Sequence, residues 1–232
     1  MDIFDQLVGT IEAPAKPRRF VFVLLEEFTM LCFSAAVESL RIANRMSGRD
    51  LYTWVLMSES GAPVRCSAGI EFVVQHELID VSRDDTVMIC GGVNIKTASS
   101  KKIVNWLRRE SRRGPLMAGL CTAGYTLAKA GLLDGKRATI HWENQDSFIE
   151  EFEEVELTKS VFVVDGNRIT TAGGTSSIAG LNQVLEQHLG VSTMTANPIA
   201  SMTVSPRVQA HALAADAPAL LIACGLALRS FD

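Results

Sequence analysis

Three nearly continuous apolar runs dominate the pattern of hydrophobic and polar positions along the chain. They are Arg19–Leu25, Thr86–Cys90 and Leu116–Ala118. A strand in the middle of a parallel sheet is buried on both faces, so it lacks the alternation of a half-exposed strand. The pattern therefore predicts three buried strands of a parallel sheet, with further strands at Leu51–Met57 and Ile169–Thr171.

Segments with helical character separate these strands. The predicted helices are Phe33–Met46, Ala98–Arg113, Ala123–Ala130, Asn144–Glu154 and Ser176–His188. In the first helix, Ser34 is the expected N-cap and Gly48 lies just past the end. Shorter strands are expected at Ile70–Val74, Arg137–Ile140, Val155–Leu157 and Val161–Val164, with a hairpin turn at Asp165–Asn167. Strands that alternate with helices predict an α/β fold, a doubly wound and mostly parallel sheet flanked by helices.

The chain changes character near its two ends. Residues 1–18 contain Pro14 and Pro17 in a short mixed stretch, and we expect a flexible leader there. Residues 19–189 hold the predicted strands and helices and form the expected domain. Residues 190–232 are rich in Ala, Ser, Thr and Pro, with few charges and poor periodicity, so irregular or weakly helical structure is expected.

Composition narrows the class of protein. The 232 residues are 47% hydrophobic and 21% charged, with a formal net charge of −4, which is typical of a soluble globular domain. An isoelectric point near 5.6 argues against this chain as the main contact with nucleic acid. The longest apolar run, Ala217–Leu228, is too short to span a bilayer, and the first 19 residues lack the pattern of a signal peptide. We therefore expect a cytoplasmic protein without a membrane partner.

The five cysteines are scattered along the chain, and no two of them form a CxxC motif. They are Cys32, Cys66, Cys90, Cys121 and Cys224. Their spacing indicates neither a disulfide framework nor a zinc site, and we expect no metal and no cofactor.

One of these cysteines, Cys121, stands where a predicted strand turns sharply into a predicted helix. The strand Leu116–Ala118 leads into Gly119–Thr122, and the helix Ala123–Ala130 follows at once. A strand, a tight turn and a helix form the geometry of a nucleophile elbow, and the N-terminus of the helix favours thiolate over thiol. The alternative is a buried, inert cysteine at an ordinary strand–helix junction.

Residues with chemical potential also follow the ends of neighbouring strands. Glu26–Glu27 follow the first strand, Gly91–Gly92 follow a later one, and His141 ends another. Ligands of doubly wound folds bind at the carboxyl ends of the strands, so we expect these residues to converge on Cys121. The N–H groups of Gly91–Gly92 and Thr122 would then form an oxyanion-type pocket beside the thiolate. The alternative for Gly91–Gly92 is a plain strand-to-loop turn.

His141 lies twenty positions after Cys121, across one predicted helix and one predicted strand. This separation allows the imidazole to return beside the thiol as the general base of a Cys–His pair. In the alternative interpretation, His141 satisfies a backbone carbonyl and helps its neighbour Trp142 to pack.

Six stretches of the chain together resemble one known pattern. They are Phe20–Leu25, Glu38–Asn44, Val87–Gly92, Gly119–Thr122, Ala130–Trp142 and Ile169–Ser177. The sequence is similar to the class I glutamine-amidotransferase-like domain of PfpI-type proteins and, more narrowly, resembles the N-terminal domain of AraC/XylS-type transcription regulators. The resemblance covers about Arg19 to Ile178. It implies a flavodoxin-like, amidotransferase-like sandwich that senses a small molecule, is commonly dimeric, and precedes a DNA-binding domain with two helix-turn-helix motifs.

The chain departs from the family pattern in three places. Alignment on Glu38 puts Cys32 where enzymes of the superfamily have an acidic residue that is hydrogen-bonded to the cysteine. Thr122 follows Cys121 where many PfpI-type enzymes have histidine, and the family's regulators have threonine there. The tail after Ile178 contains no basic recognition helix, and we interpret it as a divergent or truncated end of a regulator.

These observations favour a non-catalytic, ligand-sensing domain of an AraC-type transcription regulator. The expected pocket residues are Cys121, Thr122, Gly91, Gly92, His141, Trp142 and Cys32. N–H donors and a polarisable thiol suit an anionic or zwitterionic effector, and a homodimer that reaches DNA only through a helix-turn-helix module is expected. One alternative is a cysteine-dependent hydrolase, hydratase or glyoxalase-like enzyme with Cys121 as nucleophile and His141 as base. A second is a dimeric scaffold or redox sensor in which Cys121 is oxidised to a sulfenic or sulfinic acid held by the same N–H groups.

Overall fold

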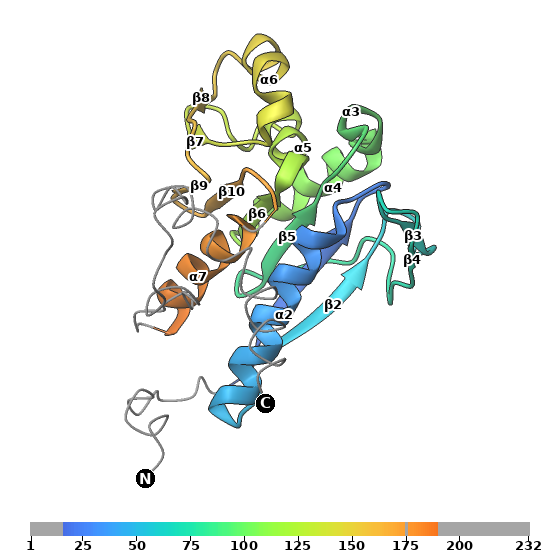
Figure 1. Ribbon diagram of the computed structural model, residues 1–232, viewed down its shortest axis with the longest axis vertical. Helices are drawn as coiled ribbons and strands as arrows, with labels where there is room; N and C mark the ends of the chain where they lie inside the picture. The colour runs from blue at the N-terminus through green and yellow to red at the C-terminus, as the bar shows by residue number, and fades with distance from the viewer. Residues whose placement is uncertain (1–15, 175, 190–232) are drawn as a thin grey trace, which may run out of the picture. The chain divides into compact units, whose positions relative to one another are not determined.

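A computed structural model describes residues 16–174 and 176–189 and places six strands in one sheet (Figure 1). In their order across the sheet, the strands are β2 (Tyr52–Met57), β1 (Arg18–Leu24), β5 (Thr86–Cys90), β6 (Leu116–Leu120), β10 (Arg168–Thr171) and β9 (Phe162–Asp165). Neighbouring strands pair in parallel, except that β9 runs antiparallel to β10. The predicted doubly wound, mostly parallel sheet is confirmed.

Helices and short strand pairs connect the strands of the sheet. The helices are α2 (Met30–Ser47), α3 (Ile95–Ala98), α4 (Lys101–Ser111), α5 (Gly124–Lys129), α6 (Gln145–Glu151) and α7 (Ser176–Leu189), with 3-10 turns η1 (Cys121–Ala123) and η2 (Trp142–Asn144). Outside the main sheet, β3 (Val64–Arg65) pairs with β4 (Glu71–Phe72), and β7 (Arg137–Ala138) pairs with β8 (Glu156–Leu157).

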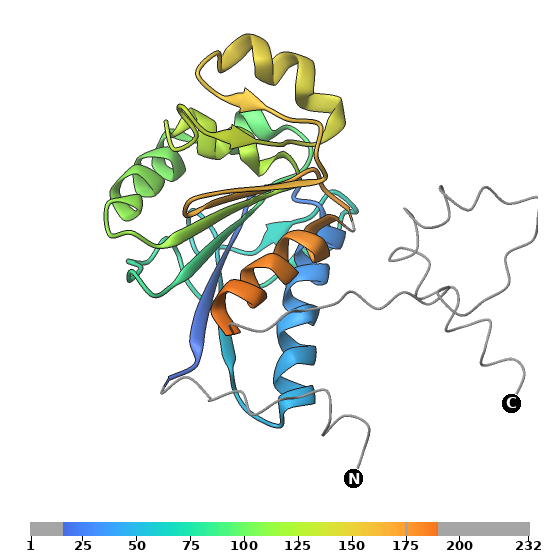
Figure 2. The ribbon, with the colours of Figure 1, turned by 90° about the vertical axis from the view of Figure 1, so that its left-hand side faces the viewer.

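The sheet is buried on both faces because alternate residues of its central strands meet different helices. Val21 and Val23 of β1 belong to the same core cluster as Leu107 of α4. Phe22 points to the opposite face, where its ring meets Phe33 of α2 edge-on with the ring centroids 5.4 Å apart. Figure 2 shows α2 on one face and α4 and α5 on the other. Burial on both faces explains why these strands are apolar without alternation.

The edge of the sheet also follows the prediction. Asp165 pairs with Arg168 across the hairpin of β9 and β10, and Gly166 has a φ of +60° in the turn between them. The predicted turn at Asp165–Asn167 is therefore confirmed. Its glycine supplies a left-handed backbone that other residues rarely adopt.

Two predicted helix starts are wrong. Helix α2 begins at Met30, and its N-cap is Thr29 rather than Ser34. The stretch predicted as one helix, Ala98–Arg113, is interrupted: α3 ends at Ala98 and α4 begins only at Lys101. The interruption has a local cause, because the side chain of Ser100 accepts a hydrogen bond from the N–H of Ile103 and caps α4.

The predictions for the ends of the chain lie largely outside the described residues. These residues do not include 1–15 of the predicted leader, the predicted tail 190–232 or Cys224. Arg18, the last residue of the predicted leader, is already the first residue of β1. The other four cysteines are buried and free of disulfides. Within the ranges that the structure covers, no helix has the length and apolar character needed to cross a membrane.

Candidate functional site

Cys121 occupies a strained turn between β6 and α5. Its φ is +61°, in the left-handed region that non-glycine residues rarely adopt. Strand β6 ends one residue before it, and the turn η1 begins at it. Strain of this kind is concentrated at functional sites, and the predicted nucleophile-elbow geometry is present.

Close packing and one hydroxyl hold the elbow in place. The N–H of Cys121 donates to Thr171 Oγ1 over 3.4 Å, at the end of β10. A Cβ at Gly119 would lie 2.9 Å from the carbonyl carbon of Ala123, so only glycine lets the strand pass beneath the turn. The elbow thus depends on two strands that lie next to each other in the sheet, β6 and β10.

The start of α2 supplies polar contacts to the Cys121 thiol. The side chain of Cys32 is hydrogen-bonded to Cys121, and Thr29 Oγ1 lies 3.6 Å from Cys121 Sγ. The hydrogen bond with Cys32 lowers the pKa of the Cys121 thiol to about 6, against the opposing effect of burial. The Thr29 hydroxyl, the nearby His141 imidazole and the N–H of Thr122 also lower this pKa.

Cys32 behaves as the protonated partner of the pair. Its hydrogen bond with Cys121 and its burial both raise the pKa of the Cys32 thiol. Cys32 Sγ also donates to the carbonyl of Gly174 over 3.9 Å. The thiol therefore stands where the family resemblance places an acidic residue, and it cannot act as a carboxylate.

Gly173 lies next to both His141 and Cys121. The φ of Gly173 is +102°. A Cβ at this position would lie 3.0 Å from Cys121 Sγ and 3.0 Å from Cδ2 of His141. The structure therefore brings His141 to the thiol, as predicted. His141 Nδ1 also lies 3.6 Å from a carboxylate oxygen of Glu143, a third group that the sequence did not single out.

Gly91 has a different role from the one predicted. The N–H of Gly91 donates to the carbonyl of Leu120 over 3.3 Å, so it does not contribute a free donor to an oxyanion pocket. A Cβ at Gly91 would lie 2.6 Å from the N of Ala123. The carbonyl of Gly92 accepts a hydrogen bond from Thr122 Oγ1 over 2.8 Å. Gly91 therefore allows backbone to pack closely against the elbow, and Gly92 does the same for the segment after β1, because a Cβ at Gly92 would lie 2.7 Å from Cα of Phe28.

Trp142 lies at the outer edge of the site. Its side chain is 71% exposed, and its ring centroid lies 5.7 Å from that of His141. By contrast, Cys121 is only 4% exposed. An indole next to the imidazole offers an apolar and polarisable surface to whatever approaches His141.

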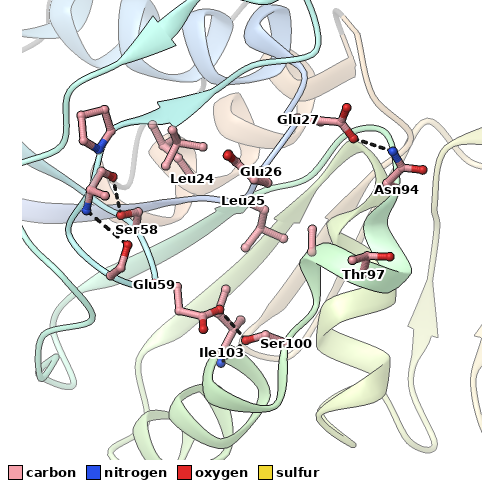
Figure 3. A pocket seen from close by; sticks show the side chains of 15 residues that line it. Leu24, Leu25, Glu26, Glu27, Ser58, Glu59, Asn94, Thr97, Ser100 and Ile103 are labelled. Atoms are coloured by element: carbon pink, nitrogen blue, oxygen red, sulfur yellow. Dashed lines mark hydrogen bonds between the residues drawn. The ribbon is translucent and has the colours of Figure 1, made fainter.

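A separate cavity of about 520 Å³ lies at the carboxyl ends of β1 and β2 (Figure 3). Its lining includes Leu25, Glu27, Glu59 and Ile103 but none of the predicted pocket residues. Of the predicted strand-end residues, Glu26–Glu27 therefore face this cavity rather than join Cys121. The sequence signal for it was the pair of acidic residues directly after a buried strand.

Thr29 and Gly173 are contact residues that the sequence analysis did not single out. The available signals were a threonine just before a helix and a Gly173–Gly174 pair just after a buried strand.

Comparison with known proteins places this architecture in a family. The model of the DJ-1/PfpI family matches residues 18–187. A second model, that of type IV pilus assembly protein PilM, matches residues 158–231, which is under half of the chain and mostly outside the described residues.

Relatives and solved structures point to the same group. The HTH-type transcriptional regulator CdhR of Pseudomonas aeruginosa is 40% identical over 171 residues, 74% of this chain and 51% of CdhR. GbdR, an HTH-type regulator of the same species, is 37% identical over 160 residues, 69% of this chain and 44% of GbdR. The chain thus spans about half the length of these relatives.

Among solved structures, an AraC family transcriptional regulator from Pseudomonas putida superposes with a TM-score of 0.66 at 25% identity. The match covers 74% of this chain and 92% of that chain. With the family model matched over most of the chain and the elbow in place, this chain belongs to the DJ-1/PfpI family.

Proposed function

We propose that this chain forms the small-molecule-sensing domain of an AraC-type transcription regulator. The observation that carries the proposal is the match to one half of two HTH-type regulators, CdhR and GbdR, at 40% and 37% identity. A sensing half joined to a DNA-binding half would account for this partial match, and fold alone does not specify a reaction.

The surroundings of Cys121 support sensing rather than turnover. A catalytic thiol needs a neighbour that takes and returns protons during the reaction. Cys32 offers a thiol with a raised pKa in the place of the expected acid, so it remains a neutral donor. A thiolate at Cys121 beside the N–H of Thr122 suits recognition of a polar effector, and Trp142 and His141 would form its rim.

A cysteine-dependent hydrolase, hydratase or glyoxalase-like enzyme is the second candidate. One observation favours it: the pKa of Cys121 is lowered to about 6, which leaves the nucleophile ionised at neutral pH. His141 would act as the base, with Glu143 3.6 Å from its Nδ1. The enzyme and the sensor differ in whether the bound molecule is consumed.

The sensing function carries further expectations for the whole protein. Its effector would be an anionic or zwitterionic metabolite, and its DNA contact would come from a helix-turn-helix module. A homodimer in the cytoplasm is the expected working form, since regulators of this kind act on paired half-sites.

A hybrid regulator tests the proposal. The full chain replaces the matching half of CdhR, and a reporter gene downstream of a CdhR-responsive promoter measures transcription while single metabolites are added. A metabolite that changes transcription and is recovered unchanged is the expected result. If no metabolite changes transcription, while a substrate is consumed by wild type and spared by Cys121→Ser, the chain is an enzyme and the proposal is wrong.

A further inference from the structure

The cavity at the carboxyl ends of β1 and β2 is built like a small-molecule site. Its volume of about 520 Å³ falls within the range of ligand pockets, roughly 300–1,000 Å³. Leu24, Leu25 and Ile103 provide apolar lining, and the loop from Ser58 to Val64 forms another wall (Figure 3).

The cavity also lies where the topology of the sheet favours a ligand. Strand β1 pairs with β2 on one side and β5 on the other. Helix α2, which connects β1 to β2, and helix α4, which follows β5, lie on opposite faces of the sheet (Figure 2). The carboxyl ends of β1 and β5 therefore form the topological switch point, the crevice in which open α/β sheets bind ligands. Residues that follow both strands, including Glu27 and Asn94, line the cavity.

Three carboxylates face this cavity, and each is held in position by a neutral donor. Glu59 accepts a hydrogen bond from Ser100 Oγ over 2.5 Å. Glu27 accepts one from the side-chain amide of Asn94 over 2.5 Å. Glu26 accepts one from the N–H of Arg65 over 3.3 Å. These hydrogen bonds orient the three carboxylates, and because the donors are neutral they do not balance the negative charges.

No positive charge balances these carboxylates inside the cavity. Its lining contains no lysine, arginine or histidine. Within the part of the chain that the structure describes, none of the three glutamates forms an ion pair. A concave site lined by charges of one sign concentrates ions of the opposite sign. A ligand that matches this cavity is therefore a cation that also has an apolar part.

We propose that this cavity binds a small organic cation, with an ammonium or guanidinium head on a short aliphatic or cyclic body. The body packs on Leu24, Leu25 and Ile103, and the head takes the remaining acceptor positions of Glu59. The site is distinct from the Cys121 thiol, whose contacts Thr29 and Cys32 do not line the cavity.

The cavity goes beyond the proposed function, whose anionic or zwitterionic effector is expected beside Cys121. The cation would be a second effector, and only this regulatory role rests on the proposed function. Glu27, which lines the cavity, and Thr29, which contacts Cys121, are two residues apart on a constrained segment. Glu27 has a φ of +56°, and its carbonyl accepts the N–H of Val93 over 3.1 Å. An occupant of the cavity would therefore be linked by a short, rigid path to the thiol.

Three probes of matched size and shape test the proposal on the full chain. Cyclohexylmethylammonium, cyclohexylmethanol and cyclohexanecarboxylate share a ring and differ in charge. Ligand-observed NMR titration measures their dissociation constants. The ammonium should bind with a dissociation constant on the order of 1 mM, and about tenfold more tightly than the alcohol. The carboxylate should not bind in this cavity. Equal binding of all three probes, or no binding of the ammonium, overturns the proposal.

Two variants and a matched control locate the binding. Glu59→Gln should weaken ammonium binding about fivefold and leave binding of the alcohol unchanged. Thr97→Trp, at an exposed position of the lining, should obstruct the cavity and abolish binding of both. Glu71→Gln removes the same charge from an exposed position outside the cavity and should change nothing.

Circular dichroism and melting temperature establish that each variant is folded. If Glu59→Gln and Glu71→Gln weaken binding equally, the cation senses net charge only, and the site is refuted. This assay contains no DNA and no reporter. A failure here leaves the hybrid regulator as an independent test of sensing, and a failure of the hybrid leaves the binding result intact.

Discussion

Thr29 Oγ1 lies 3.6 Å from the sulfur of Cys121, although the two residues are 92 positions apart in the chain. Thr29 is the N-cap of α2, and Cys121 begins the turn after β6. The contact therefore joins a helix N-terminus to a strained thiol. A hydroxyl and a helix N-terminus both favour the thiolate, so this pair links the fold to the ionisation of the site.

The Thr29 hydroxyl should stabilise the Cys121 thiolate. Thr29→Val keeps the shape of the side chain and removes the hydrogen-bond donor, so the pKa of Cys121 should rise above about 6. The rate of alkylation by iodoacetamide, followed from pH 5 to 9 by mass spectrometry, reports the thiolate fraction. At pH 6 the variant should react about twofold more slowly than wild type, the change that a pKa rise of roughly half a unit from about 6 produces. An unchanged pH profile would show that the hydroxyl does not stabilise the thiolate.

Cys32→Ala should raise the pKa of Cys121 further than Thr29→Val does. The hydrogen bond with Cys32 is the largest cause of the lowered pKa of Cys121. Alanine removes this hydrogen bond and leaves only a small cavity where the sulfur was. The same alkylation profile measures the effect. Cys66→Ala is the matched control, because Cys66 is also a buried free thiol and has no part in the pKa shift of Cys121. Equal shifts in the two variants would contradict the assigned pairing.

Much of the fold was predictable because strands that are buried on both faces consist almost entirely of apolar residues. The runs around Val21 and Val87 are apolar on both faces, and both residues lie in central strands of the sheet. The break between α3 and α4 was not predictable in the same way. It depends on the side chain of Ser100 as a cap, in a stretch whose helical periodicity continues across it.

The site was predictable only where its residues are local in sequence. The elbow at Cys121 follows from a strand, a turn and a helix in succession, and the return of His141 follows from one further helix and strand. The contacts of Thr29 and Gly173 depend on how distant segments pack, which no local pattern encodes. The interpretation of Gly91 as a donor was wrong because its N–H is used by the neighbouring strand end at Leu120.

The lowered pKa of Cys121 should make stability depend on pH. A thiol whose pKa falls from an ordinary value near 9.0 to about 6 on folding is ionised in the folded state and protonated in the unfolded state between these values. Its contribution is therefore complete above about pH 9 and is lost as the pH falls through about 6. Relative to Cys121→Ser, wild type should gain about 2 kcal/mol in free energy of unfolding between pH 6 and pH 8. Urea denaturation of both proteins under reducing conditions measures this difference, and parallel pH curves would contradict it.

Two adjacent glycines should respond differently to substitution by alanine. Gly173 and Gly174 both have positive φ, +102° and +58°, so alanine is strained at either position. Among the described residues, a Cβ at Gly174 would meet nothing within 4 Å, whereas one at Gly173 would lie 3.0 Å from both Cys121 Sγ and the His141 ring. Gly174→Ala should therefore lower the free energy of unfolding by about 1 kcal/mol, through backbone strain alone.

Gly173→Ala should lower it by about 2–3 kcal/mol, because steric overlap with the site adds to the strain. It should also raise the pKa of Cys121, since the added methyl group displaces the imidazole that helps to lower it. Urea denaturation and the alkylation profile measure the two effects on the same samples. Gly174→Ala has the backbone strain without the steric overlap. A shift of equal size in the pKa of Cys121 in both variants would therefore mean that the missing side chain at Gly173 does not determine how His141 and Cys121 lie relative to each other.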